Sequence, residues 1–443
     1  MGNRDSSSNA HDLLSGLFLG SRGERNLERI IEHTQDQVEE AHYQRLQHFI
    51  TNSPWDSHAL MNRIAKQTSE LFENWQDTAY IIDEKAHLKK GKKSVGVANQ
   101  YAGTVGKNEN SQVGVYAALV NGQYALLANC RLFLPKSWTE DKTRCDKAGI
   151  PTDKRDYNTK QQLALEMVKE SIAQGIQFGW VGGDGLYGHG YELSQEIEDL
   201  GKDFVFDVHE DQRIYLSKPN LSLGVKRKMG RPSTRLKSDI TSMEVREYAA
   251  HLTEKDFQKT TIRKTTKGPL NALIHVVKVW TWIAPSHREK GQPEPRQRTL
   301  IIRKSLSTKS KEKIKYTLTN IPIEKATLER FAFMQGQRYW VEKAFRDDSK
   351  DLGMSDYQIR KYNAWYHFQA LTMLAMLFVL KEIIRNKDSI PLLSYRDVKM
   401  LIKVLFADNL AKLKLTLEQM INRHLQRKRD TDRYYPACKP TSE

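Results

Sequence analysis

Cysteine is scarce in this sequence, with Cys130, Cys145 and Cys438 the only three among 443 residues. Their odd number and wide spacing exclude a disulfide framework and match none of the paired-cysteine patterns that bind zinc. The N-terminus does not resemble a secretory signal peptide. We therefore expect the protein to work in a reducing, cytoplasmic environment.

Long hydrophobic runs and several familiar catalytic patterns are also missing. The apolar stretch at residues 371–380 is too short to cross a bilayer, so we expect a buried core helix there and no membrane partner. The histidines lack HExxH spacing, and the glycine-rich residues 182–185 lack the lysine of a phosphate loop. No serine occupies a nucleophile elbow. Zinc-protease, P-loop and serine-hydrolase patterns are therefore excluded.

Positive charge, in contrast, is abundant. Lys and Arg outnumber Asp and Glu by 70 to 54, which gives a net charge of +16. Residues 211–320 alone hold 25 Lys and Arg against 9 Asp and Glu. Clustered cations are typical of nucleic-acid contact because they displace the counterions of phosphates. A solvated, lysine-rich surface is the alternative. We expect double-stranded DNA as the partner.

The spacing of apolar residues divides the chain. Residues 1–75 repeat at helical intervals and predict a helical N-terminal domain for DNA binding or dimer formation. Residues 76–204 predict strands, with Asn121-Gly122 as a tight hairpin between two of them. The predicted strands lie at 79–83, 113–120, 124–134 and 178–182, with a helix at 161–173 before the last. This order is typical of the first part of a ribonuclease H-like sheet.

The rest of the chain interrupts and then completes that core. Residues 205–320 alternate strand-like runs with charged loops and predict a β-rich segment, called here the basic insertion. Residues 321–361 resume the core with one helix at about 323–349, and residues 362–443 predict a helical C-terminal region with a basic tail. The expected fold class is α/β: a ribonuclease H-like catalytic core interrupted by a β-rich insertion, with helical N-terminal and C-terminal parts.

Three acids stand at chemically useful places in this arrangement. Asp83 and Asp184 each follow a short apolar strand, and Glu342 lies on the predicted helix of residues 323–349. Carboxylates are ligands that Mg²⁺ prefers, and two ions about 3.5–4 Å apart can clamp both oxygens of a phosphodiester displacement. A lone aspartate after a strand is more often a cap or turn residue. The order and placement of all three acids favour a metal site of two Mg²⁺ ions, with Mn²⁺ as the alternative.

Other side chains are candidates for DNA contact. Arg338 lies four residues before Glu342, hence on the same helix face, and is suited to a phosphate beside the scissile bond. Trp280 and Trp282 flank one strand residue, where they either pack on the sheet or stack on an unpaired base. A candidate minor-groove hook, whose alternative is a disordered basic loop, surrounds a Gly-Arg-Pro sequence. Its basic residues are Lys226, Arg227, Lys228 and Arg231.

Several short motifs, in one order, resemble the bacterial insertion-sequence transposases of the DDE type, and most closely their insertion-sequence 701 group. They are Leu46-Gln47-His48-Phe49-Ile50, Ser53-Pro54-Trp55-Asp56, Ile82-Asp83-Glu84, Lys89-Lys90-Gly91-Lys92, Leu134-Pro135-Lys136-Ser137-Trp138, Gly183-Asp184-Gly185 and Val341-Glu342. The resemblance implies that Asp83, Asp184 and Glu342 are the catalytic triad. It also implies Mg²⁺, cleavage at terminal inverted repeats, strand transfer into target DNA, and a homodimer or larger complex that works on the bacterial nucleoid.

The sequence departs from the related Tyr-Arg-Glu-Lys signature at two positions. Gln335 stands at the tyrosine position, and Ser349 stands at the lysine position with Lys350 next to it, so Lys350 becomes the candidate DNA contact. Two other functions stay open: a DNA-binding protein that has lost the chemistry, and a structure-selective nuclease without strand transfer. The three intact acids oppose the first. The insertion and the long C-terminal helices, which offer surface for two DNA ends, oppose the second.

Overall fold

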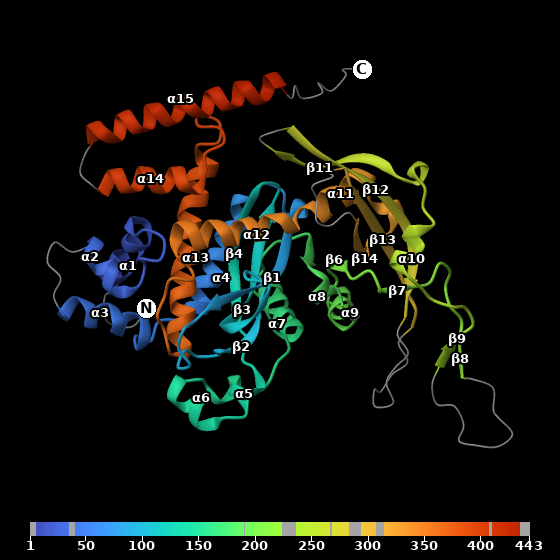
Figure 1. Ribbon diagram of the computed structural model, residues 1–443, viewed down its shortest axis with the longest axis horizontal. Coiled ribbons are helices and arrows are strands. Elements are labelled where there is room, and N and C mark those ends of the chain that lie inside the picture. The colour runs from blue at the N-terminus through green and yellow to red at the C-terminus, as the bar shows by residue number, and fades with distance from the viewer. Residues whose placement is uncertain are drawn as a thin grey trace. The chain divides into compact units, whose positions relative to one another are not determined.

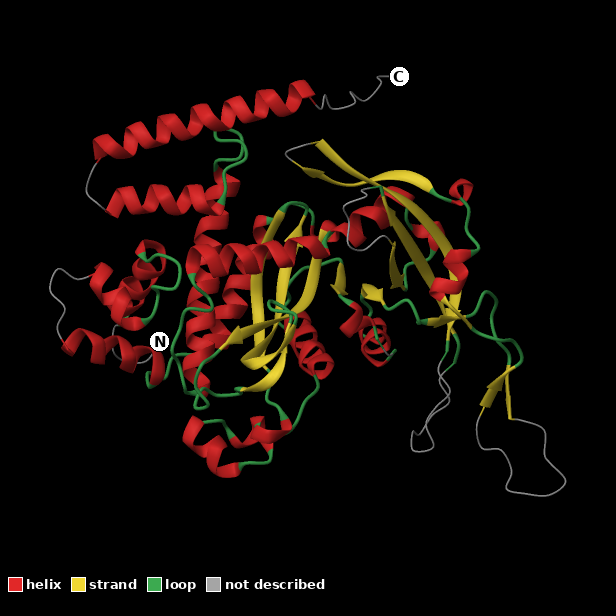
Figure 2. Ribbon diagram, viewed as in Figure 1, coloured by secondary structure: helices red, strands yellow, loops and turns green. Residues whose placement is uncertain are grey.

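A computed structural model describes residues 6–34, 40–189, 191–223, 236–265, 268–282, 294–306, 314–406 and 410–434. The chain divides into two compact units (Figure 1). The first unit is formed by Met1–Phe178, Thr266–Gly268 and Tyr339–Glu443, and the second by Gly179–Thr265 and Pro269–Arg338. Both units combine helices with strands (Figure 2), so the predicted α/β class is confirmed.

The first unit contains an antiparallel sheet built around one long strand. The strand β3 (Lys107–Asn121) pairs with β1 (Thr78–Leu88) over its second half, with β2 (Ala98–Ala102) at its start and with β4 (Tyr124–Leu132) at its end. The predicted hairpin is confirmed, but its turn is Gly122-Gln123, since Asn121 still pairs with Tyr124; Gly122 has a φ of +59°, which favours glycine. The three predicted antiparallel strands are therefore confirmed.

Helices surround this sheet. The N-terminal helices are α1 (Ser7–Leu19), α2 (Leu27–Thr34), α3 (Glu40–Thr51) and α4 (Ser57–Leu71), and smaller ones are α5 (Lys136–Thr139) and α6 (Lys142–Ala148). Asp56 caps α4 because its carboxylate accepts the backbone N–H groups of His58 and Ala59. The helix α7 (Lys160–Ala173) opens with a capping box from Thr159. The C-terminal helices are α13 (Tyr362–Arg385), α14 (Tyr395–Phe406) and α15 (Leu410–Tyr434).

The helix α13 forms the centre of the first unit. Among the described residues it alone is long and apolar enough to cross a membrane, and 67% of its most apolar 18-residue window is buried inside the protein. Residues Leu371, Met373, Met376 and Leu380 are all nearly inaccessible to solvent. The stretch at 371–380 is thus the buried core helix that the sequence predicted.

The second unit contains a further run of paired strands. A short parallel pair, β5 (Trp180–Gly183) with β6 (Asp203–Val208), continues antiparallel into β14 (Ile314–Thr319), β13 (Arg296–Ser305), β12 (Gly268–Thr281) and β11 (Gln258–Thr265). Its helices include α8 (Gly185–Gly188), α9 (Glu192–Asp199), α10 (Val245–Ala250) and α11 (Leu328–Gly336). Short strands β7 (Arg213–Ile214) to β10 (Met243–Glu244) complete it. The β-rich character predicted for the basic insertion is confirmed.

The prediction of a single helix at about 323–349 is wrong. Residues 328–336 form α11, a turn follows at Gln337, and a separate helix α12 (Arg338–Asp347) leads into a π turn, Asp348–Leu352. The N–H of Gln337 bonds to the carbonyl of Met334, three residues back, which closes α11. A side chain at Gly336 would lie 2.8 Å from Ile262 of β11, so this position is a glycine where the helix passes close to the sheet. Glycine also weakens a helix interior.

Candidate active site

Asp83 lies in the middle of β1 and not at its end, because the strand continues to Leu88. Residues 78–82 are fully buried, and Asp83 is the first partly exposed position of the strand. Its Oδ1 accepts the backbone N–H of Glu84 at 2.8 Å, and Glu84 in turn accepts a bond from Lys160 at 3.0 Å. Asp83 is therefore a carboxylate at the boundary between a rigid core strand and solvent.

A buried polar network fixes β1 behind Asp83. The hydroxyl of Tyr116, the residue opposite Asp83 on β3, donates to Gln369 at 2.9 Å. Because that proton is committed, Tyr116 accepts from Nε2 of His87 at 2.7 Å, and Nδ1 of His87 then accepts from Ser355 at 3.0 Å. Burial lowers the pKa of His87 well below its ordinary value. The ring of His87 is therefore neutral and in one tautomer, and it ties β1 to Tyr116 of β3 and to Ser355 in the segment before α13.

Glu342 lies on α12 with its side chain exposed. A neighbouring face of the helix is buried through Val341 and Phe345, and the ring of Phe345 packs edge-on against Tyr116 with 5.3 Å between centroids. The ammonium of Lys85 donates to the carbonyl of Phe345 at 3.4 Å. Lys85 is two residues after Asp83, so the strand of the first acid also holds the helix of the third.

Asp348, which the sequence analysis missed, is a fully buried carboxylate at the start of the π turn. Neither of its carboxylate oxygens has a hydrogen-bond partner among the described residues. Burial raises the pKa of Asp348 to about 7, while the charges of Lys85 and Arg25 oppose that rise. Burial likewise lowers the pKa of Lys85. The neighbouring residue, Asp347, is also an aspartate, but its side chain is partly exposed. The sequence alone therefore gives no signal that separates the two.

Asp184 belongs to the second unit, where it caps α8. Its Oδ1 accepts the backbone N–H of Leu186 at 3.0 Å, directly after the buried strand β5. The surrounding glycines permit close packing: a Cβ at Gly188 would lie 2.0 Å from the carbonyl oxygen of Asp207. The predicted placement of Asp184 at a strand end is therefore confirmed, and its capping role leaves the carboxylate partly exposed.

The three acids offer only carboxylate oxygens, which suit a hard divalent cation. Among the residues that the structure describes, no three His, Cys, Asp or Glu side chains lie grouped so that they could hold a metal ion. Asp83 and Glu342 are parts of the first unit, and Asp184 is part of the second. The donor chemistry fits a divalent ion, whereas an assembled three-ligand site stays a prediction.

Arg338 and the signature position Gln335 belong to one polar chain in the second unit. The Nε of Arg338 lies 3.1 Å from Oδ2 of Asp207, and Oδ1 of Asp207 accepts from the hydroxyl of Thr317 at 2.7 Å. The amide of Gln335 donates to the same hydroxyl at 2.7 Å. Gln335 is buried, so at the position of the signature tyrosine this chain has a residue that orients the arginine's partner.

The other predicted DNA contacts are spread over several elements. Trp280 is half-buried and exchanges two backbone hydrogen bonds of 2.8 Å with Tyr215, which ties β12 to the residue just after β7. Lys218 lies 5.6 Å above its ring. Trp282, also half-buried, comes just after the end of β12, and Lys350 is exposed in the π turn. The candidate hook, Lys226, Arg227, Lys228 and Arg231, lies outside the described residues.

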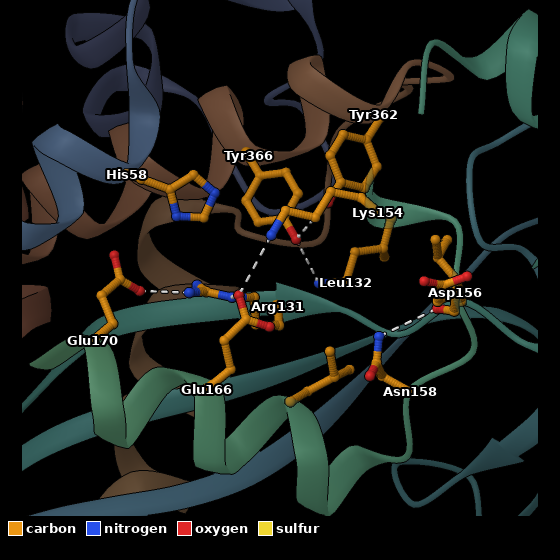
Figure 3. A pocket seen from close by; sticks show the side chains of 12 residues that line it. His58, Arg131, Leu132, Lys154, Asp156, Asn158, Glu166, Glu170, Tyr362 and Tyr366 are labelled. Atoms are coloured by element: carbon orange, nitrogen blue, oxygen red, sulfur yellow. Dashed lines mark hydrogen bonds and ion pairs between the residues drawn. The ribbon is translucent and has the colours of Figure 1, made fainter. Parts of the chain in front are cut away.

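A cavity of about 340 Å³ in the first unit was not predicted (Figure 3). Arg131 crosses its floor and donates to Glu166 at 3.1 Å and to Glu170 at 2.5 Å, while Tyr362 and Tyr366 form the opposite wall. The opposed charges satisfy one another within the cavity. None of the three acids lines it. We therefore assign the cavity to packing between β4, α7 and α13.

Comparisons with known proteins found a matching family and similar individual proteins. Residues 1–269 match the family described as DDE superfamily endonuclease. The chain is 30% identical over 173 residues to a probable transposase for insertion sequence element IS701 from Microchaete diplosiphon, a match that covers 39% of this chain and 42% of that relative. A solved structure, the piggyBac transposase synaptic complex with hairpin DNA, aligns with 99% of this chain and 79% of its own at 10% identity and a TM-score of 0.39.

Proposed function

Because the chain belongs to the DDE superfamily endonucleases, we propose that it is a DNA transposase that cuts at the ends of its element and joins them to target DNA. The observation that carries the proposal is that the family match spans both Asp83 and Asp184, each held on a defined element. The 30% identity to a probable insertion-sequence transposase supports transposition in particular. Glu342 lies beyond the matched residues, so its assignment depends on its place on α12.

Proteins of this family generally act with divalent metal ions. In the proposed reaction Asp83, Asp184 and Glu342 hold two Mg²⁺ ions, which, when bound, lower the pKa of the attacking oxygen and neutralise charge on the leaving oxygen. The chain itself supplies rigid supports: β1 fixes Asp83, the cap of α8 fixes Asp184, and α12 fixes Glu342. Each element holds its own carboxylate in place, and the proposal requires that the three come together around the ions.

The proposed DNA surface is the basic insertion, whose charge excess suits two phosphate backbones. Arg338 and Lys350 flank the third acid in sequence, and Trp280 and Trp282 offer rings to an unpaired base. A transposase must hold two DNA ends together, so we further propose a homodimer or larger assembly. We place this activity in the bacterial cytoplasm, on nucleoid DNA.

The test is incubation of the purified protein with duplexes that carry the element's ends, in Mg²⁺ or Mn²⁺, with products mapped at nucleotide resolution. We expect a free 3′-OH at the element end and then a joined product. Asp83→Ala, Asp184→Ala and Glu342→Ala should each abolish cleavage and leave end binding intact. Glu73→Ala removes a carboxylate that is 90% exposed and serves as the control.

The products also separate the alternatives. Cutting without joining would indicate a nuclease, and end binding without cutting by the unaltered protein would indicate a DNA-binding protein that has lost the chemistry. Retained cleavage in the Glu342→Ala variant would remove that residue from the site.

A further inference from the structure

A buried arginine joins the N-terminal helices to the segment that follows α12. Arg25, between α1 and α2, is fully buried. Its Nε donates to the carbonyl of Leu17 at 3.0 Å, one terminal nitrogen donates to Asp356 at 3.2 Å, and the other donates to the carbonyl of Lys350 at 3.3 Å. One guanidinium group therefore spans the end of α1 and both sides of the loop after α12.

A buried lysine makes the same connection from the C-terminal helices. Lys399 of α14 is 8% exposed, and its ammonium donates to the carbonyl of Gly20 at 3.0 Å and to the carbonyl of Asp351 at 2.7 Å. Gly20 is the C-cap of α1, and Asp351 lies within the π turn. Two cations from distant parts of the chain thus hold α1 against the π turn, an arrangement called here the cation junction.

The π turn is shaped around this junction. Gly353 has a φ of +78°, and a Cβ there would lie 2.5 Å from the Cδ of Arg25. Its N–H bonds to the carbonyl of Asp348, five residues earlier, at 2.7 Å. Turns of this i→i+5 kind are rare and often mark functional sites. Gly353 therefore permits the positive φ of the turn and leaves room for the side chain of Arg25.

The charge of the N-terminal helices also bears on their role. Residues 1–75 hold seven Lys and Arg against eleven Asp and Glu, the opposite balance to the basic insertion. Such a segment is poorly suited to a general phosphate surface. Instead α1 contacts α13, α14 and the π turn. These contacts favour an internal mechanical role for α1.

We propose that Arg25 and Lys399 are positioning residues that fix the π turn Asp348–Leu352 and, through it, the helix carrying Glu342. The inference rests on the proposed role of Glu342 in DNA cleavage. Most acceptors at the junction are backbone carbonyls, so the cations set the path of the chain. Displacement of a catalytic group by about 1 Å can slow a reaction roughly 100-fold. The hydrogen bonds given above for Arg25 and Lys399 end on residues 17–20 and 350–356 and not on β1.

The first arm of the test measures hydrogen exchange of the full-length protein without DNA. Arg25→Met and Lys399→Met should each speed exchange at residues 339–354 by roughly tenfold to a hundredfold, the equivalent of one lost charged hydrogen bond. Exchange in β1 should stay within about twofold of the unaltered protein. Arg29→Met is the matched control, since Arg29 is an exposed arginine of the same helical region, paired with Glu32. It should leave both segments unchanged.

The second arm measures single-turnover cleavage of end DNA and the Kd for the same DNA. Both junction variants should lose roughly 10- to 100-fold in rate with a Kd within about twofold. Arg25→Lys, which keeps the charge but cannot reach all three acceptors, should recover part of the rate. If a methionine variant does not fold, Arg25→Lys alone decides both arms.

Unchanged hydrogen exchange at residues 339–354 in the folded variants would show that Arg25 and Lys399 do not fix the π turn. Faster exchange with an undiminished cleavage rate would overturn the positioning role. Absence of cleavage by the unaltered protein would count against the proposed function, and the exchange arm would still judge the junction by itself.

Discussion

The buried carboxyl of Asp348 makes the stability of the first unit depend on pH in a defined direction. Burial raises the pKa of Asp348 from an ordinary value near 4 to about 7 in the folded chain. Between these values the folded chain keeps a proton that the unfolded chain releases, so the free energy of unfolding falls as the pH rises. The fall begins near pH 4 and ends near pH 7, where the folded carboxyl also ionises.

The size of this effect follows from the shift. Three pKa units correspond to about 4 kcal/mol, since one unit equals about 1.4 kcal/mol. Asp348→Asn removes the ionisation but keeps the shape of the side chain. At pH 5 the folded carboxyl is still protonated but the unfolded one is mostly ionised, so the variant should already be more stable than the unaltered protein by about 1–2 kcal/mol. At pH 8 the folded carboxyl has also ionised, so nearly the full shift applies and the variant should be more stable by roughly 3–4 kcal/mol.

Urea denaturation of both proteins at pH 5 and pH 8, followed by tryptophan fluorescence, measures the difference. Asp347→Asn is the matched control, because that neighbouring acid is 19% exposed and paired with Lys343. It should lose a small amount of stability at both pH values. If Asp348→Asn is destabilised equally at pH 5 and pH 8, the carboxylate is stabilised in the folded chain and the reasoning from burial is wrong.

Three other perturbations test separate features. Gly353→Ala should lower the free energy of unfolding by roughly 1–2 kcal/mol because of its φ of +78°, whereas Gly103→Ala, in open space, should be nearly neutral in thermal melts. Glu170→Ala should cost roughly 2–4 kcal/mol by uncovering the buried Arg131, and Glu166→Ala, whose carboxylate is 44% exposed, less than about 1 kcal/mol. DNA affinity should fall steeply between low and moderate salt in a fluorescence-polarisation titration, because the basic insertion releases counterions; a flat response would contradict its role as a DNA surface.

Local signals in the sequence predicted local structure well. The Asn121-Gly122 dipeptide predicted a hairpin there because the turn needs a residue with positive φ, and Gly122 supplies it. The start of α4 is equally local, because the side chain of Asp56 caps its first turn. Asp184 was placed correctly after its strand for the same reason. At Asp56 and Asp184 the residue that indicates the helix start in the sequence also accepts the hydrogen bond that caps the helix.

Features that depend on contacts between residues far apart in the sequence were not predicted. The strand β1 runs past Asp83 because β3 continues to pair with it, whereas the apolar pattern stops there. The break at Gln337 interrupts a sequence that keeps helical spacing on both sides. Asp348 differs from Asp347 only by its burial, which the partners of the π turn decide. The three acids were named from spacing and resemblance, and their convergence stays a prediction.

The cation junction also constrains when the protein can become active during its synthesis. Gly20 and its partner Lys399 are 379 positions apart in the chain. At about 5–20 residues per second, a ribosome takes roughly 20–75 s to travel between them. The π turn beside α12 therefore lacks its hydrogen bond from Lys399 until nearly the whole polypeptide has emerged from the ribosome. Under the proposed function, a truncated product that already contains the basic insertion is expected to bind DNA without cutting it, so premature termination would yield a competitor of the full-length protein.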